Sequence, residues 1–160
     1  MMISKSDALH MARAIKLAEE GMKKGDGGPF GAVVVKNDQI IGSGWNRVLQ
    51  SNDPTAHAEI VAIRSACAHI DSYRLEGCTL YVNCEPCPMC LAAIYWARIE
   101  RLCFGASRKD AAAIGFDDDH IYQEVCLPVH ERKLEITTIS SEESLRIMRQ
   151  WPTLAIRKDY

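Results

Sequence analysis

The stretch NDPTAHAEIVAIRSAC, residues 52–67, predicts a helix that begins near Asp53, with two polar residues just inside it. Asp53 is a suitable capping residue, and Pro54 suits the first turn of a helix. His57 and Glu59 follow, separated by one alanine. Residues two apart on a helix point in different directions, so these side chains cannot share a partner on one lateral face. Both could reach a group that lies at the end of the helix.

A second stretch, NCEPCPMCLAAIYWAR at residues 83–98, supplies a partner for His57. Cys87 and Cys90 are three residues apart at the beginning of a predicted helix, where both sulfur atoms share a face and the thiolate form is favoured. One histidine and two cysteines suit Zn²⁺ and leave a fourth position for water, whose pKa zinc lowers to about 7. We therefore expect one zinc ion per subunit, bound by His57, Cys87 and Cys90, with Glu59 as the proton-transferring residue.

A structural zinc module without catalysis is the alternative from a different class of function. It would need a fourth ligand, and Cys84 lies three residues before Cys87. Against it, a closed site would leave Glu59 without a task, and an α/β chain of this size does not need a metal to fold. The other four cysteines lie within apolar patterns and are expected to be small buried hydrophobes: Cys67, Cys78, Cys103 and Cys126.

Composition favours a single domain with a small-molecule partner. The chain has 160 residues, 48% of them hydrophobic, a formal net charge of −2 and a pI near 6.2. Lysine and arginine form no run, which argues against binding to a nucleic acid polymer. The N-terminus is charged before any apolar stretch, and the longest apolar run, Leu91–Ala97, is too short to span a bilayer. We expect a cytoplasmic protein that contacts no membrane and whose cysteines bind metal or are buried.

Helical and strand patterns alternate along the chain without a linker or a repeat. Met11, Ile15, Ala18 and Met22 form one helical stripe, and residues 31–45 predict a hairpin that turns at Asn37 and Asp38. This order predicts an α/β fold with three α/β/α layers around a central mixed sheet of about five strands. The other predicted strands are residues 78–83, 101–106 and the segment LEITTI at 134–139, and the other predicted helices are residues 88–98 and 141–151, with short helices within 107–125.

The order His57-Ala58-Glu59 followed by Pro86-Cys87-Pro88-Met89-Cys90 resembles the signature of the zinc nucleobase deaminases, in which the glutamate is the acid and base. The chain is similar to the cytidine deaminase-like superfamily. Within it, GGPFGAVVVK, SNDPTAHAE, CEPCPMCLAAIYWAR and IGFDDDHIY resemble the bacterial guanine deaminases, over nearly the whole chain. This resemblance implies hydrolysis of guanine at C2 to xanthine and ammonia. It also implies a homodimer in which residues 151–160 of one subunit close the partner's site.

The resemblance also implies residues that bind a purine. Asn46 and Asp118 match polar positions of the family, Phe30 and Trp96 match aromatic positions, and Tyr160 matches a terminal tyrosine. A carboxylate suits guanine, because the N1–H and the exocyclic amine both donate. The amide of Ala58, in the first helical turn, is a candidate donor to the purine O6. Without the resemblance, Asp118 could belong to a solvated turn, Phe30 and Trp96 to the core, and Asn46 to a loop.

Other substrates remain open from the sequence. Guanosine, adenine, cytosine or cytidine, and tRNA adenosine are alternatives, although tRNA binding would require a basic face. At the C-terminus, Pro152 is expected to make Trp151 extended, so that the tail leaves the body there. Leu154 and Ile156 could then anchor the tail on a second subunit, because exchange of an end segment is a low-cost route to a dimer.

Overall fold

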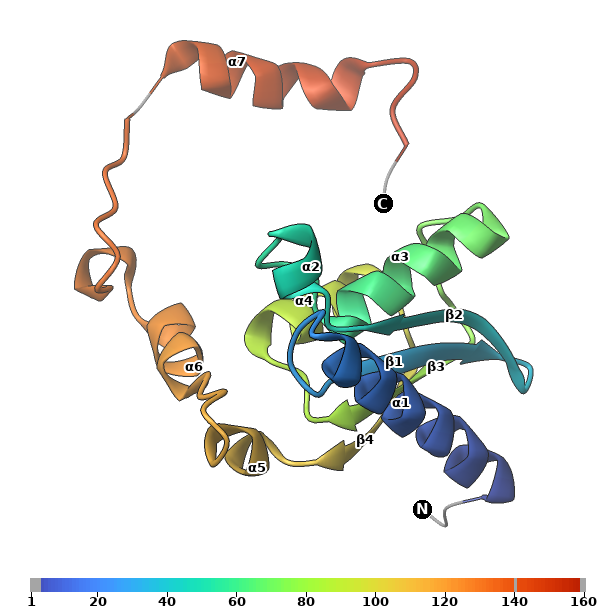
Figure 1. Cartoon of the computed structure of the whole chain (residues 1–160). Helices are drawn as coiled ribbons and strands as arrows, with labels where there is room; N and C mark the ends of the chain where they lie inside the picture. Colours follow the sequence, from blue (N-terminus) through green and yellow to red (C-terminus); the bar gives the residue numbers. More distant parts are fainter. Residues whose placement is uncertain (1–3, 140, 159–160) are drawn as a thin grey trace. The chain divides into compact units, whose positions relative to one another are not determined.

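The computed structural model describes residues 4–139 and 141–158 (Figure 1). The chain divides into two compact units, Met1–Ile121 and Tyr122–Tyr160. The first unit contains the whole β-sheet. Its elements in chain order are α1 (Lys5–Lys24), β1 (Gly31–Lys36), β2 (Gln39–Trp45), α2 (Val48–Ser51), α3 (Ala58–Ile70), β3 (Cys78–Cys84), α4 (Pro88–Trp96), β4 (Arg101–Ala106) and α5 (Arg108–Ala112). Helix α6 (Asp119–Cys126) begins in the first unit and ends in the second.

The sheet is mixed, with the strand order β2-β1-β3-β4. Strand β1 pairs antiparallel with β2 and β3, whereas β3 and β4 are parallel. The predicted β1–β2 hairpin is confirmed, since Asn37 (φ 49°) and Asp38 (φ 65°) both adopt the positive φ angles of a type I′ turn. The sheet of the described residues has four strands, so the prediction of about five is wrong.

The missing strand is the one predicted from LEITTI at residues 134–139. The segment lies in the second unit and carries no strand assignment. Alternating apolar side chains indicate which residues could share a face, but a strand also requires a neighbouring backbone for its hydrogen bonds. The described sheet lies in the first unit and consists of β2, β1, β3 and β4.

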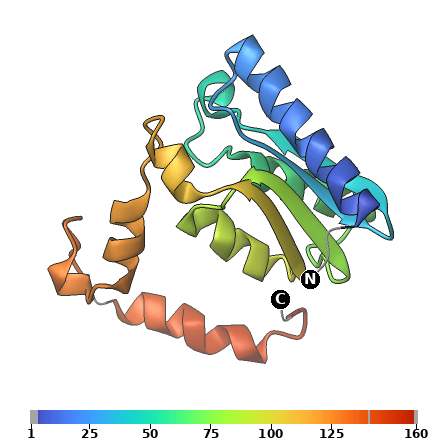
Figure 2. The ribbon, with the colours of Figure 1, turned by 90° about the horizontal axis from the view of Figure 1, so that it is seen from below.

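Helices cover both faces of the sheet, which confirms the three-layer α/β/α architecture (Figure 2). Helix α1 packs on one face, and α3 and α4 pack on the other. Gly44 of β2 lets α3 approach closely, because a Cβ there would lie 2.8 Å from the Ala58 carbonyl oxygen. The α1 layer is formed by Ala14, Leu17, Val33, Val35 and Tyr81. The opposite layer includes Ala58, Ala62, Ala66, Val34, Leu80, Val82 and Ile94.

The buried face of α1 differs from the predicted stripe. Ile15 and Met22 are 52% and 47% exposed, whereas Ala18 is buried as part of that stripe. The buried face is rotated from the predicted stripe, because it follows Ala14, Leu17, Ala18 and Gly21 and also includes the polar residues Asp7 and His10.

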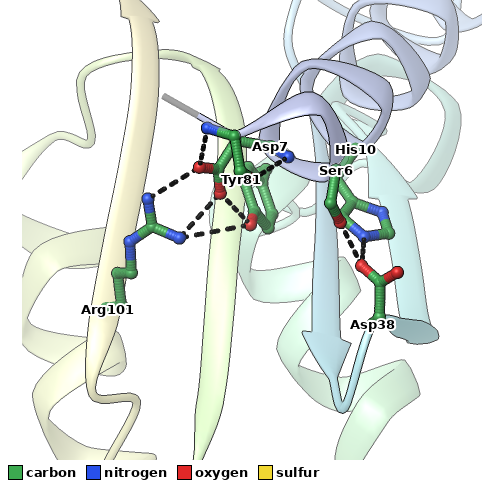
Figure 3. Close-up of polar contacts among 7 residues, drawn as sticks. Ser6, Asp7, His10, Asp38, Tyr81 and Arg101 are labelled. Carbon is green, nitrogen blue, oxygen red and sulfur yellow. Dashed lines mark hydrogen bonds and ion pairs between the residues drawn. The ribbon is translucent and has the colours of Figure 1, made fainter. Parts of the chain in front are cut away.

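Polar contacts attach the beginning of α1 to the sheet (Figure 3). The Asp7 carboxylate accepts hydrogen bonds from the Arg101 guanidinium at 2.7 and 3.2 Å and from the Tyr81 hydroxyl at 2.7 Å. The Arg101 contact is the main reason why the pKa of Asp7 lies well below its usual range. Burial, together with Asp7, raises the pKa of Tyr81 to about 12. A second contact joins the helix to the hairpin turn, with His10 Nε2 2.9 Å from Asp38 Oδ1.

The second unit contains the end of α6, the 3₁₀ helices η1 (Val129–Glu131) and η2 (Trp151–Thr153), and α7 (Glu142–Gln150). Trp151 is helical, with φ −50° and ψ −49°, so the prediction of an extended Trp151 is wrong. Pro152 occupies the first turn of η2, a position that requires no backbone N–H. Among the described residues, no helix combines the length and apolarity needed to span a membrane.

Candidate active site

His57 and Glu59 lie at the beginning of α3, but this helix begins later than predicted. His57 is the N-cap, in an extended conformation with φ −67° and ψ 157°, and Ala58 is the first helical residue. Asp53 stabilises a preceding turn, where its Oδ1 accepts hydrogen bonds from the amide and hydroxyl of Thr55 at 2.8 and 2.7 Å. His57 therefore lies at the helix end, and Glu59 in the first turn.

The beginning of α4 brings two cysteines to His57. Cys87 is the N-cap of α4, and Cys90 is a buried residue of its first turn. His57 Nδ1 lies 3.6 Å from Cys87 Sγ and 3.5 Å from Cys90 Sγ. Zinc bonds of about 2.3 Å to sulfur and about 2.05 Å to nitrogen, at a tetrahedral angle, separate the two ligand atoms by about 3.6 Å. The geometry of the three side chains therefore fits a zinc ion.

The charges of this group also favour a cation. Hydrogen bonding from Cys90, followed by that from His57, lowers the pKa of Cys87 to about 4, so this residue is a thiolate at neutral pH. The same contact and burial raise the pKa of Cys90, because a second thiolate would lie beside the first. A divalent cation removes this repulsion and stabilises both thiolates. His57, Cys87 and Cys90 thus form a group that is able to bind a zinc ion.

Cys84 does not join the group, which argues against a structural site with four ligands. The metal-binding group found among the described residues contains His57, Cys87 and Cys90. Cys84 is buried, and its Sγ lies 3.7 Å from the carbonyl oxygen of Ser107, to which it donates. Burial raises its pKa to about 11, so it remains a thiol. A group of three protein side chains leaves the fourth position of a tetrahedral zinc ion open for a water molecule.

Glu59 is a buried carboxyl group in the same cavity. Its residue is 6% exposed. Burial is the main reason why its pKa lies above its usual range. A carboxyl group with a raised pKa can both accept and return a proton near neutral pH. This environment fits the proton-transferring role predicted from the sequence.

His57, Glu59 and Cys87 line a cavity of about 670 Å³ in the first unit. Small-molecule sites typically measure about 300–1,000 Å³. Phe30 lines the cavity as predicted and meets Phe116 edge to face, with ring centroids 4.9 Å apart and an interplanar angle of 87°. Phe116 was not predicted, because it lies in an irregular segment where no periodic pattern assigns a face. Together the two rings form an aromatic wall.

Asn46 and Asp118 both line the cavity. Asn46 is buried, and its Oδ1 accepts a hydrogen bond from the Val48 amide at 3.2 Å. Gly27 makes room for it, since a Cβ at this glycine would lie 2.0 Å from Asn46 Oδ1. Burial raises the pKa of Asp118. Ala58 is fully buried at the first position of α3, where an amide has no acceptor within the helix.

The structure does not place two of the predicted aromatic residues, Trp96 and Tyr160, at the cavity. Trp96, at the end of α4, is 63% exposed and is not among the residues that line this cavity. Helix α4 buries Cys90 and Ile94, which lie four residues apart on one face. Tyr160 lies outside the described residues. The roles that were predicted for Trp96 and Tyr160 stay predictions.

Comparisons with known proteins agree with this site. Residues 4–106 match the family of the cytidine and deoxycytidylate deaminase zinc-binding region. A guanine deaminase of Bacillus subtilis is 49% identical over 94% of this chain and 96% of that protein. The X-ray structure of a guanine deaminase from Bacillus subtilis superposes with a TM-score of 0.93 and 48% identity, over 96% of this chain and 98% of that chain. A tRNA-specific adenosine deaminase of Haemophilus influenzae is 47% identical over 72% of this chain and 69% of that protein. The chain therefore belongs to the family of the cytidine and deoxycytidylate deaminase zinc-binding region.

Proposed function

We propose that this protein hydrolyses guanine to xanthine and ammonia. The observation that carries the proposal is that His57, Cys87 and the buried Glu59 line one cavity with Asp118, while Cys90 Sγ lies 3.5 Å from His57 Nδ1. Guanine presents two donors, N1–H and the exocyclic amine, beside the carbon that is attacked. A carboxylate accepts from such donors more strongly than a neutral group does.

The extent of the similarity supports guanine over tRNA. The guanine deaminase of Bacillus subtilis matches 94% of the chain, whereas the tRNA deaminase of Haemophilus influenzae matches 72%. The net charge of −2 does not favour a polyanionic substrate. Among the residues that line the cavity, Arg108 is the single lysine or arginine.

Glu59, Asp118 and Ala58 then each have a defined task in the reaction. Zinc, when bound, supplies the Lewis acidity that makes a water molecule nucleophilic near neutral pH. Glu59 would accept one proton from the attacking water and pass it to a ring nitrogen of the purine as the C2–O bond forms. It would then carry the second proton of that water from the new C2 hydroxyl to the exocyclic amine, so that the C2–N bond breaks and ammonia leaves. Asp118 accepts from the donors of guanine, and the Ala58 amide donates to O6.

The remaining predicted residues orient the purine. The amide of Asn46 is held at the cavity wall through its contact with Val48. Phe30 provides an apolar surface for the flat rings, and we assign the same task to Trp96. Tyr160 would add a ring and a hydroxyl at the entrance of the site.

We further infer one functional domain, residues 1–160, that forms a homodimer with residues 151–160 exchanged onto the partner subunit. Two observations support this assembly. Residues from 122 onward form a compact unit of their own. Helix α7 buries none of its residues, and Leu154 and Ile156 are exposed in the same unit. We also propose a cytoplasmic location, because all seven cysteines are free, which suits a reducing compartment.

The test is ammonia release from a substrate panel by the zinc-loaded protein. The panel contains guanine, guanosine, adenine, cytosine and cytidine, together with a tRNA substrate for adenosine deamination. We expect guanine to give the highest kcat/KM. Greater activity on tRNA adenosine or on a pyrimidine would reject guanine as the substrate while keeping the deaminase chemistry. Absence of ammonia release from every substrate would reject the catalytic assignment.

A further inference from the structure

Three consecutive aspartates at the beginning of α6 have three different environments. Asp117 Oδ1 accepts a hydrogen bond from the Asp119 amide at 3.0 Å, so this side chain caps the turn. Asp119 Oδ1 lies 3.3 Å from a guanidinium nitrogen of Arg108. Asp118, between them, lines the cavity, and burial raises its pKa. Asp117 and Asp119, the residues before and after Asp118, are therefore both held by these contacts. This restricts the direction in which the Asp118 carboxylate can point.

Arg108 is itself attached to the segment that carries the metal ligands. Its backbone N–H donates to Glu85 Oε2 at 3.0 Å, and the Glu85 amide donates to the Ala106 carbonyl at 2.9 Å. Glu85 precedes Cys87 by two residues. One end of Arg108 is thus fixed beside the metal-binding loop, while its guanidinium reaches Asp119.

We propose that Arg108 is a positioning residue, which holds the turn 117–119 through Asp119 so that the Asp118 carboxylate faces the substrate. This inference rests on the proposed function. Arg108 and Asp118 line the same cavity, and the positive charge of Arg108 favours the ionised form of Asp118, against the effect of burial. An ionised Asp118 is the stronger acceptor for the donors of guanine.

Because the ion pair between Arg108 and Asp119 is partly exposed, its effect on the placement of Asp118 can be measured separately from any effect on folding. The side chains of Arg108 and Asp119 are 36% and 51% exposed. Pairs with this much exposure contribute little to stability, because water screens them. Loss of the pair should therefore change how Asp118 is placed without unfolding the protein or releasing the metal.

The test uses a charge exchange in the zinc-loaded protein, with guanine as substrate. Arg108→Glu should raise KM for guanine about fivefold, the upper range for such a pair, while kcat changes less than about twofold. The double variant Arg108→Glu with Asp119→Arg should return KM to within about twofold of the wild-type value. Arg13→Glu removes a pair of comparable exposure on α1, where Arg13 lies 3.6 Å from Glu20, and should leave both constants unchanged. Zinc content and thermal midpoint are measured for every variant.

Two results would overturn the inference. If Arg108→Glu matches the wild-type protein on guanine, Arg108 has no positioning task. If the charge exchange is no better than Arg108→Glu alone, Arg108 does not act through Asp119. A wild-type protein that releases no ammonia from guanine would instead reject the proposed function, and the substrate panel identifies that case before any variant is made.

Discussion

At the scale of single residues, Glu59 shows how burial changes the acid–base behaviour of a side chain, because burial raises its pKa. Replacing Glu59 with glutamine keeps its size and removes its ability to accept a proton. Because Glu59 lies outside the group of His57, Cys87 and Cys90 that is able to bind a metal ion, the Glu59→Gln variant should retain one zinc per chain and its thermal midpoint, while kcat falls at least ~10²-fold. Steady-state kinetics and metal analysis check this expectation. A fully active variant would remove Glu59 from proton transfer.

Cys84 and Cys87 have the same side chain but opposite environments. Cys87 is a thiolate beside His57, whereas Cys84 is a buried thiol that donates to Ser107. Cys87→Ser should lose zinc and activity together, because a hydroxyl is a poor replacement for a thiolate ligand. Cys84→Ser should keep about one zinc per chain, measured by atomic absorption. Zinc loss from Cys84→Ser would instead indicate a fourth protein ligand.

A third residue-scale test concerns the recognition of guanine by Asp118. Asp118→Asn replaces an acceptor with an amide that can present a donor to the donors of guanine. The loss of a charge-assisted hydrogen bond should lower kcat/KM by the equivalent of roughly 1.5–3 kcal/mol, with zinc content unchanged. Kinetics on guanine measure this loss, and unchanged turnover would leave Asp118 as a residue of the turn only.

At the scale of elements, the contact between α1 and the sheet should make stability depend on pH. The pKa of Asp7 is held well below its usual range, mainly by Arg101 and then by Tyr81. A depressed pKa contributes stability that is present above the unfolded value of about 3.9 and is lost as pH falls below it. Asp7→Asn should therefore lower the urea midpoint at neutral pH, and its difference from wild type should shrink as pH falls below about 4. Asp71→Asn is the control, because it removes a carboxylate at the exposed end of α3. If the difference in urea midpoint between Asp7→Asn and wild type stayed constant as pH falls, the charge of Asp7 would have no such role.

The elements that could be predicted from the sequence are those specified by local chemistry. The Asn37–Asp38 turn and the cysteine pair at the beginning of α4 depend on residues adjacent in the chain, and both are confirmed. The late start of α3 at Ala58 was missed, because Asp53 caps a turn with the same chemistry that would cap a helix. Whether residues 134–139 form a fifth strand, and whether Phe116 reaches the cavity wall, depend on contacts between segments that are distant in the sequence. No local pattern reports such contacts.

At the scale of the whole molecule, the two-unit organisation raises the question of what residues 122–160 do. Their apolar side chains in α7 and the tail include Leu145, Met148 and Ile156, all of them exposed. Exposed apolar side chains on a helix and a tail commonly mark an interface. The proposed exchange of residues 151–160 between two subunits would give these side chains a partner and would place a chain end at each active site.

Complementation between two inactive chains tests this exchange. One chain carries Glu59→Gln and an intact tail, and the other carries Glu59 but lacks residues 157–160. In a mixed dimer with exchanged tails, one of the two sites combines an intact Glu59 with an intact tail. Equal mixing makes about half of the dimers mixed, so refolding the chains together should restore roughly a quarter of the wild-type activity per site.

The matched control mixes Glu59→Gln with a chain that carries both Glu59→Gln and the deletion. No site in that mixture contains Glu59, so it should stay at the background of the Glu59→Gln dimer, although it forms the same mixed dimers. Size-exclusion chromatography and native mass spectrometry establish that heterodimers are present in both mixtures. Recovery in the first mixture alone would then require the tail to act in trans. Equal, absent recovery in both mixtures would mean that each tail serves its own subunit. The two mixtures bring the same surfaces together and differ only in whether an intact Glu59 can meet an intact tail. A tail that serves no site would show itself earlier, because the chain that lacks residues 157–160 would then be active alone.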